Sequence, residues 1–291
     1  MEETAQQQPQ QHQPVGRPSI FSNRKVLYGG IIAVIIIVAA ALTLTGNGGG
    51  SGTGAQLAQF DGQPVPQSVL AQLAVPNNVS AAIHSGFATN FPTKVNATRL
   101  EIGGRPEILY IGAEYCPYCA VQRWPLIIAL MRFGTFSGIE YMTSSATDAY
   151  ANTPTFTFAN ATYTSKYIAF VSRELTTNKY NASIGGYPAL QRLNASEQAI
   201  YARFNPQGSI PFIDYANATI DVGGNYGDPT ILANMNWSEI AGMLSNPSST
   251  QAQALVGSAN LVTAQICMLD NNTPASVCGQ SYISGIEAQL G

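Results

Sequence analysis

The chain has 291 residues, of which 45% are hydrophobic and only 10% are charged, and its formal net charge at pH 7 is −3. This balance argues against a basic nucleic-acid-binding surface, and we expect no nucleic-acid partner. The two histidines, His12 and His84, are far apart in the sequence. A Ser-His-Asp triad or a histidine-rich metal centre therefore has little support, and we expect no metal site.

The N-terminal region predicts a tail, a membrane anchor and a tether. Residues 1–25 are rich in Gln and Pro, as is typical of a disordered tail. Val26–Thr45 contains no charge, and a helix of this length spans about 30 Å, one bilayer core. Basic residues before it predict a cytoplasmic N-terminus, a single-pass cell-membrane protein and an extracellular main domain. The small residues 39–41 leave a cleaved signal peptide open, and the glycine-rich residues 46–54 predict a flexible linker.

N-glycosylation sequons support the same orientation, because all of them follow the predicted span. The candidate acceptors are Asn78, Asn96, Asn160, Asn181, Asn194, Asn217, Asn236 and Asn271. Glycans on such a surface would compensate for its few charges. The four cysteines also lie beyond the span, which is typical of an oxidising compartment.

Residues 55–104 predict an N-terminal extension of the outer domain with a short helix over 65–73. Two strands are expected, over Thr98–Ile102 and Glu107–Ile111, and Gly103-Gly104 forms the turn between them.

The apolar strand ends in Cys116-Pro117-Tyr118-Cys119, and a helical pattern follows to about Phe133, with Gly134 as the expected C-cap. This order places Cys116 at a helix N-terminus, where N–H groups and the helix dipole stabilise a thiolate. Cys119 is close enough to resolve a mixed disulfide. Two other interpretations of the motif are that the cysteines form half of a zinc site or that they form a structural disulfide bridge.

The next elements alternate between strands and helices. Strands are predicted over 138–144, 155–158 and 167–172, and a helix over about 188–204. A hairpin follows, in which Ser209–Tyr215 and Ala218–Val222 are joined by a turn at Ala216-Asn217. Helices are then expected at about 229–245, 250–269 and 278–290.

Cys267 and Cys278 predict a structural disulfide between two C-terminal helices, which closes a short loop. Two alternatives remain open. The pair could relay electrons to Cys116–Cys119, or all four cysteines could bind zinc.

The segment 105–245 resembles the thioredoxin superfamily, a redox family of α/β proteins. The resemblance rests on GAEYCPYC around the two cysteines, on Pro125 within the following helix, and on Ile210-Pro211 before the hairpin, which resembles the family's cis-proline loop. It implies a thioredoxin-like fold with a helical and strand insertion over about 145–208. A C-terminal helical segment, 246–291, follows the fold, and one transmembrane helix precedes it.

The resemblance also implies the roles of the site residues. Cys116 and Cys119 would be the redox-active CxxC disulfide, and no cofactor is required because the pair carries two electrons. Ile210 and Pro211, with Tyr115, Pro117 and Tyr118, would line the substrate groove. The family's buried acid, six positions before the first cysteine, is replaced here by Tyr110, which leaves the proton acceptor of Cys119 open.

The whole outer domain also resembles an archaeal membrane-anchored family, domain of unknown function 929, which occurs in thermoacidophiles. The sequence thus predicts a membrane-anchored extracytoplasmic thiol–disulfide oxidoreductase. Its expected partners are secreted or cell-surface proteins and a membrane redox protein. The alternative is a glycosylated cell-surface binding module in which Cys116–Cys119 is only a structural bridge.

Overall fold

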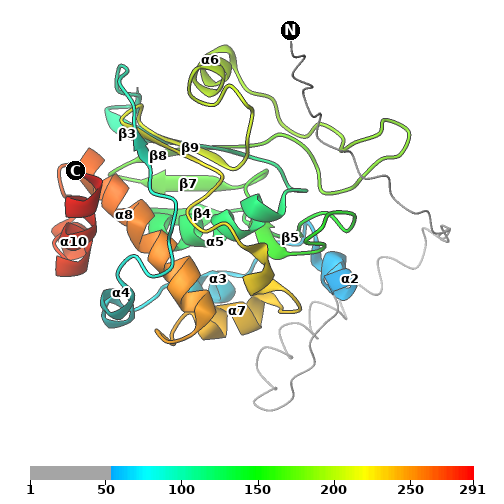
Figure 1. Ribbon diagram of the computed structural model, residues 1–291, viewed down its shortest axis with the longest axis horizontal. Coiled ribbons are helices and arrows are strands. Elements are labelled where there is room, and N and C mark those ends of the chain that lie inside the picture. The colour runs from blue at the N-terminus through cyan, green and yellow to red at the C-terminus, as the bar shows by residue number, and fades with distance from the viewer. Residues whose placement is uncertain (1–53) are drawn as a thin grey trace, which may run out of the picture. The chain divides into compact units, whose positions relative to one another are not determined.

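Strand β3 (Arg105–Gly112) lies inside a mixed sheet, since its residues 108–111 are completely buried. A computed structural model describes residues 54–291 (Figure 1). The strand order is β1-β10-β9-β3 with antiparallel neighbours, and β8 (Ala169–Glu174) pairs with β3 in parallel on its other side. Strand β2 (Glu101–Ile102) pairs with the first residues of β3. The described residues therefore form a mixed α/β fold.

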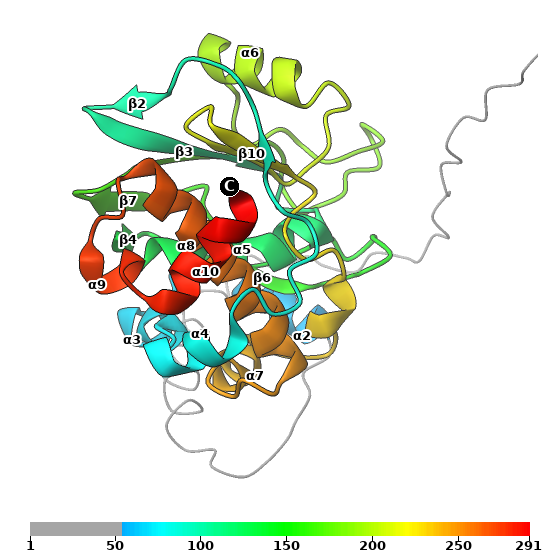
Figure 2. The same ribbon diagram turned by 60° about the vertical axis from the view of Figure 1, so that its left-hand side comes forward.

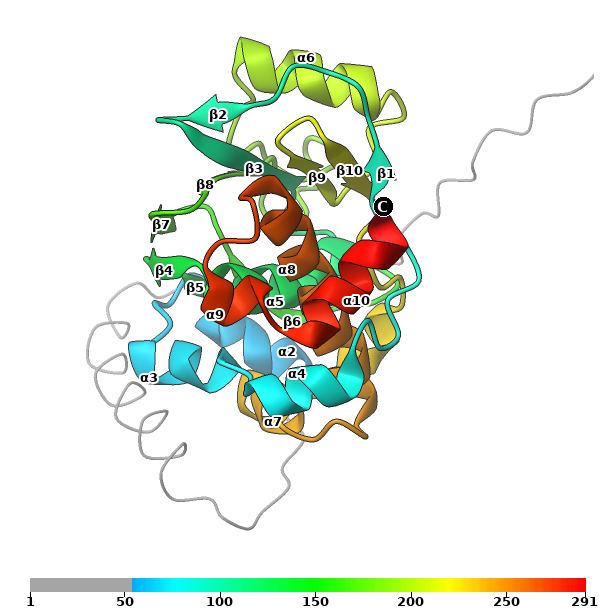
Figure 3. The same ribbon diagram turned by 90° about the vertical axis from the view of Figure 1, so that its left-hand side faces the viewer.

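Helices cover both faces of this sheet because successive side chains of a strand point to opposite faces. Ile108 and Tyr110 belong to the core beneath α5 (Pro117–Leu130) and α8 (Gly257–Leu269). Leu109 and Ile111 pack instead with the apolar side chains of α6 (Ala195–Phe204). Figure 1 and Figure 3 show α6 on one side of the sheet and α5 and α8 on the other.

The remaining elements are short. The other strands are β1 (Thr93–Lys94), β4 (Gly134–Ser137), β5 (Glu140–Thr143), β6 (Pro154–Thr157), β7 (Thr162–Ser165), β9 (Phe212–Tyr215) and β10 (Thr219–Val222). The other helices are α2 (Gly54–Leu57), α3 (Gln67–Leu70), α4 (Asn77–Ile83), α7 (Trp237–Met243), α9 (Ala275–Cys278) and α10 (Ser281–Leu290). Helices α4, α9 and α10 lie near α8, as Figure 2 shows.

The region 145–208, which the sequence predicted to be an insertion, contains β8, the parallel partner of β3 in the main sheet. The segment between α5 and β8 forms two small antiparallel sheets, β4 with β7 and β5 with β6. The strand predicted over 138–144 therefore pairs outside the main sheet. Parallel partners come from distant segments, so a local pattern does not identify them.

Two boundaries differ from the predictions for local reasons. Helix α6 begins at Ala195 instead of 188, because Asn194 and Glu197 form a capping box there. The preceding segment bonds instead to the chain after β8, where the Leu190 N–H donates to the Leu175 carbonyl. Gly134 begins β4 and does not cap α5, which ends at Leu130 and has Met131 as its C-cap residue.

The predicted C-terminal helices are present but divided. The region 229–245 holds a short 3-10 helix, Pro229–Leu232, and then α7. Ala252–Leu269 begins as a π-helical turn and continues as α8. Within residues 54–291 this helix alone has the length and apolar composition to cross a membrane, but 89% of it is buried inside the protein. The tail 1–25, the predicted span 26–45 and all of the linker except Gly54 lie outside the described residues.

Candidate active site

Cys116 is the N-cap of α5, the position that the sequence predicted. Strand β3 ends at Gly112, and α5 starts with Pro117, whose missing N–H is not needed in the first turn. The backbone N–H of Cys119 donates to the Sγ atom of Cys116 over 3.1 Å. The thiol of Cys116 thus occupies the place that a Ser or Asp oxygen usually takes at a helix start.

The two thiols differ in their readiness to ionise. Burial raises the pKa of Cys116, but hydrogen bonds from Cys119 and the positive charge of Arg123 outweigh it, so the pKa lies below its ordinary value. Burial and the neighbouring Cys116 together raise the pKa of Cys119 well above its ordinary value. Both residues are buried, but Cys116 is 4% exposed and Cys119 0% exposed. Cys116 is therefore the better nucleophile of the pair.

The loop before β9 lies next to the cysteine pair. The Ile210–Pro211 peptide is cis, as the resemblance implied. The thiol of Cys116 lies 3.8 Å from the carbonyl oxygen of Ile210. Pro211 is buried and Ile210 half-buried. Residues distant in the sequence therefore meet at Cys116.

A second loop, which contains Gly224 and Asn225, packs against Pro211. A Cβ atom on Gly224 would lie 3.4 Å from Pro211 Cγ and 3.0 Å from Gln122 Oε1, and the φ of Gly224 is +84°. Gln122 of α5 exchanges two 2.9 Å hydrogen bonds with Asn225, one with its side chain and one with its backbone N–H. The glycine-rich segment 223–227 is thus a loop that lies against Gln122 and Pro211.

A buried carboxyl group completes this support. Asp221 accepts hydrogen bonds from the side-chain amides of Asn225 and Asn90. Burial raises the pKa of Asp221 to about 7. Polar side chains therefore connect α5, the end of β10 and the segment around Asn90 behind the cysteine pair.

A buried ion pair, absent from the sequence-based site, lies beneath the cysteines. Arg123 of α5 and Glu174 at the end of β8 are both 0% exposed. Two hydrogen bonds join them, Nε to Oε1 at 2.8 Å and Nη2 to Oε2 at 2.6 Å. Nη2 also donates to the carbonyl of Ala113 at 2.8 Å. The spacing of one helical turn from Cys119 to a cation could have indicated Arg123, but no local signal indicates Glu174 as its partner.

Two further titratable side chains lie near this ion pair. Tyr110 is fully buried, and its hydroxyl has no hydrogen-bond partner among the described residues. Burial raises its pKa well above the ordinary value. Burial also raises the pKa of Glu114, whose carboxylate accepts a 2.7 Å hydrogen bond from Thr157.

The expected groove residues next to the cysteines differ in exposure. Tyr118 is exposed and contacts Tyr150 edge-on, whereas Pro117 is buried. Tyr115 is half-buried and stacks on Tyr187, with ring centroids 4.3 Å apart. Of the residues that the sequence analysis expected to line a groove, Tyr118 is therefore the most exposed.

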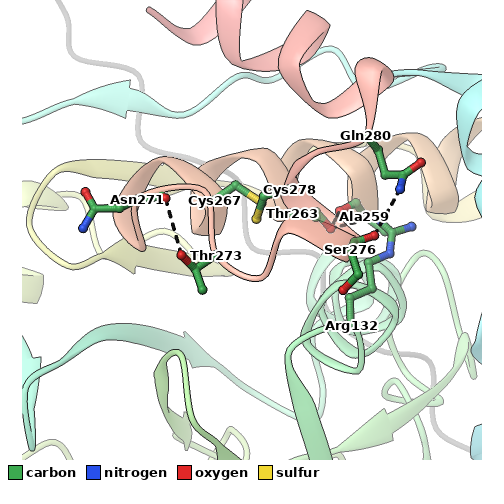
Figure 4. The surroundings of a disulfide bond; sticks show 9 residues. All are labelled: Arg132, Ala259, Thr263, Cys267, Asn271, Thr273, Ser276, Cys278 and Gln280. Atoms are coloured by element: carbon green, nitrogen blue, oxygen red, sulfur yellow. Dashed lines mark hydrogen bonds between the residues drawn. A yellow bond between two sulfur atoms is a disulfide. The ribbon is translucent and has the colours of Figure 1, made fainter.

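Cys267 and Cys278 are bonded to each other, as their spacing predicted. The bond links the last turn of α8 to α9, and Figure 4 shows it between these two helices. Nearby, the guanidinium of Arg132 bonds the Thr263 hydroxyl of α8 at 2.7 Å. Because Cys267 and Cys278 are bonded to each other, they are not available to bind zinc together with Cys116 and Cys119.

The predicted glycosylation acceptors differ in accessibility. Asn217 is 8% exposed, and its Nδ2 donates to the Thr98 carbonyl at 2.7 Å, which removes it as an acceptor in the folded domain. Asn236 is half-buried and caps α7. The exposed acceptors are Asn78, Asn96, Asn160, Asn181, Asn194 and Asn271.

Comparison with known proteins finds a family match for one segment of the chain. Residues 91–207 match the family model described as Domain of unknown function (DUF929), which confirms that part of the resemblance. The matched segment contains Cys116, Cys119, Arg123 and Glu174 and ends before Pro211. No curated protein and no solved structure matches the chain.

Proposed function

We propose that this chain, whose residues 91–207 match the DUF929 family model, is a membrane-anchored extracytoplasmic thiol–disulfide oxidoreductase. One observation carries the proposal: Cys116 caps a helix with its thiol, receives the Cys119 N–H and lies against the Ile210 carbonyl. A structural bridge needs none of these contacts. A nucleophilic thiol benefits from the capping hydrogen bond of the Cys119 N–H, because this bond stabilises the Cys116 thiolate.

The topology supports a thioredoxin-like fold for the same region. The order β8-β3-β9-β10, with only β3 and β8 parallel, is similar to the core of that superfamily. The arrangement of α5 and α8 on one face and α6 on the other is also similar. In this comparison, the redox cysteines and the cis proline occupy the corresponding positions.

The proposed reaction balances with the cysteines alone. The Cys116 thiolate attacks a substrate disulfide, one substrate sulfur leaves as a thiolate, and a mixed disulfide forms. Cys119 then gives its proton to the substrate thiolate that left first and attacks Cys116 Sγ, which releases the second substrate sulfur as a thiolate. Two electrons pass to the substrate, and the pair becomes a disulfide. The reverse sequence oxidises a substrate dithiol.

Trapping tests the proposal in the full-length protein. A Cys119→Ser variant cannot resolve the mixed disulfide and should accumulate cross-linked partners through Cys116. A Cys116→Ser variant is the matched control and should capture few. If the Cys119→Ser protein captures no more than this control, the oxidoreductase proposal is wrong.

The burial of both cysteines favours a second candidate, the cell-surface binding module with a structural Cys116–Cys119 bridge. In that case the pair should resist mild reduction in the folded protein, and wild-type protein should show no exchange with a model disulfide. Exchange by the wild type would reject this candidate.

A further inference from the structure

The side chains around the cysteine pair include one buried cation, Arg123. It follows Cys119 by four residues in α5, so the two side chains project from the same face of the helix. Its Nη2 atom donates to the Ala113 carbonyl, which also accepts the backbone N–H of Cys116 at 3.2 Å. Arg123 and the backbone N–H of Cys116 thus donate to the same carbonyl oxygen, that of Ala113.

The position of Arg123 is fixed by Glu174. The two hydrogen bonds between them use Nε and Nη2, and the Nη1 atom is buried without a partner among the described residues. Burying a charged group without full hydrogen bonding costs free energy, even when the group is partly paired. A fully apolar pair at this position would avoid that cost, so the ion pair requires a reason beyond packing.

The electrostatic surroundings indicate that reason. The titratable groups around the two thiols come from the elements packed there: Tyr110 of β3, Glu114 and Tyr115 before α5, Tyr118 and Arg123 of α5, Asp148 of the loop after β5, Glu174 of β8 and Tyr201 of α6. Apart from Arg123, each of these groups is neutral when it is protonated and negative when it is ionised. Arg123 lowers the pKa of both cysteines, against the effect of burial.

We propose that Arg123 is a positioning residue that supplies positive charge to the thiolate form of the Cys116–Cys119 pair, with Glu174 as the clamp that holds it. This inference rests on the proposed thiol–disulfide function. The thiolate gains Coulomb energy from Arg123 because both groups are shielded from water. Stabilising the thiolate stabilises the reduced pair and makes the disulfide a stronger oxidant.

Three variants of the full-length protein test the proposal. Arg123→Met with Glu174→Gln removes both charges and avoids an unpaired buried carboxylate. Arg123→Lys keeps the cation but loses the bidentate geometry. Glu174→Gln keeps Arg123 and removes its counter-charge. Alkylation of Cys116 in the reduced protein is followed against pH with iodoacetamide and peptide mass spectrometry, and urea unfolding is measured in parallel.

In the double variant, the midpoint of alkylation should lie about one pH unit higher than in the wild type. At a pH below the midpoint, the fraction of Cys116 present as thiolate should then be about tenfold lower. Arg123→Lys should stay near the wild-type midpoint, and Glu174→Gln should remain there or move lower. A purely structural ion pair would change the urea midpoint and leave the alkylation midpoint in place. A folded double variant with the wild-type midpoint overturns the proposal. If the double variant does not fold, an upward shift in Glu174→Gln overturns it.

The results separate this inference from the proposed function. If wild-type protein exchanges no disulfides and the double variant still shifts the midpoint, the oxidoreductase assignment fails and the role of Arg123 stands. If exchange occurs and the midpoint does not move, the role of Arg123 fails and the oxidoreductase assignment stands.

Discussion

The backbone N–H of Cys119 points at the Sγ atom of Cys116 and bonds it over 3.1 Å. This contact makes the two cysteines chemically unequal, because it favours the thiolate of Cys116, while Cys119 is completely buried. A redox pair needs this asymmetry, with one thiol ready to attack and the other held as a thiol until the mixed disulfide forms.

Cys116 of the reduced wild-type protein should therefore alkylate with a midpoint below about pH 8.5, the ordinary pKa of a free cysteine. Cys119 should react little in the same range, since burial and the neighbouring Cys116 raise its pKa. The measurement is iodoacetamide labelling against pH. Protein unfolded in urea is the control, in which both cysteines should titrate near the ordinary value. Equal labelling of both thiols in the folded protein would contradict the asymmetry.

The Cys267–Cys278 disulfide should stabilise the domain without taking part in exchange. Replacing both residues by Ala should lower the free energy of unfolding by about 3 kcal/mol, because the bond closes a short loop in the unfolded chain. Urea unfolding measures the loss, and exchange with a model disulfide should change less than about twofold. Loss of exchange in the folded variant would favour an electron relay between the two pairs.

Gly224 and Gly223 offer a matched test of the support behind Pro211. Both have positive φ values, 84° and 91°, so an added Cβ strains each backbone by about 1–2 kcal/mol. Only the Cβ at Gly224 would also crowd Gln122 and Pro211. Gly224→Ala should therefore slow disulfide exchange about fivefold or more at a temperature where both variants are folded. Gly223→Ala should lose similar stability with little change in rate, and equal rates would refute the role of this contact.

The domain should be more stable in mild acid than at neutral pH. Burial raises the folded-state pKa of Asp221 to about 7 and that of Asp214 to about 6, from 3.8. A raised carboxyl pKa contributes stability that is fully present below the unfolded value and is lost as the pH rises through the folded value. For Asp221 the loss is on the order of 4 kcal/mol by neutral pH.

Urea unfolding at intervals between pH 4 and pH 8 measures this dependence. Asp221→Asn should flatten the slope between about pH 4 and pH 7, whatever its effect on absolute stability. A wild-type protein whose stability rises steadily across this interval would contradict the prediction.

The proposed orientation predicts that a membrane-impermeant protease applied to intact cells removes the domain that follows Val26–Thr45. The basic residues before this segment and the sequons after it give the direction. Reduced Cys116 should likewise react with a membrane-impermeant thiol reagent. Labelling only after the membrane is broken would reverse the orientation.

The features that the sequence determined by itself are those with local causes. The Cys-Pro-Tyr-Cys run after an apolar strand placed the helix start, because a cap and the adjacent turn involve only neighbouring residues. The turn at Ala216-Asn217 and the disulfide between Cys267 and Cys278 follow equally from short spacing. The cis geometry at Pro211 came from the family resemblance.

Only the tertiary structure decided which distant residues meet. The parallel partner of β3 is β8, and no local pattern separates β8 from the strands of the intervening small sheets. Nothing in the sequence next to Arg123 or Glu174 distinguishes them from ordinary surface charges, but the fold buries both of them beneath the cysteines. Side chains can exchange solvation by water for contact with each other only after the sheet and α5 have packed, so the sequence alone does not reveal the pair.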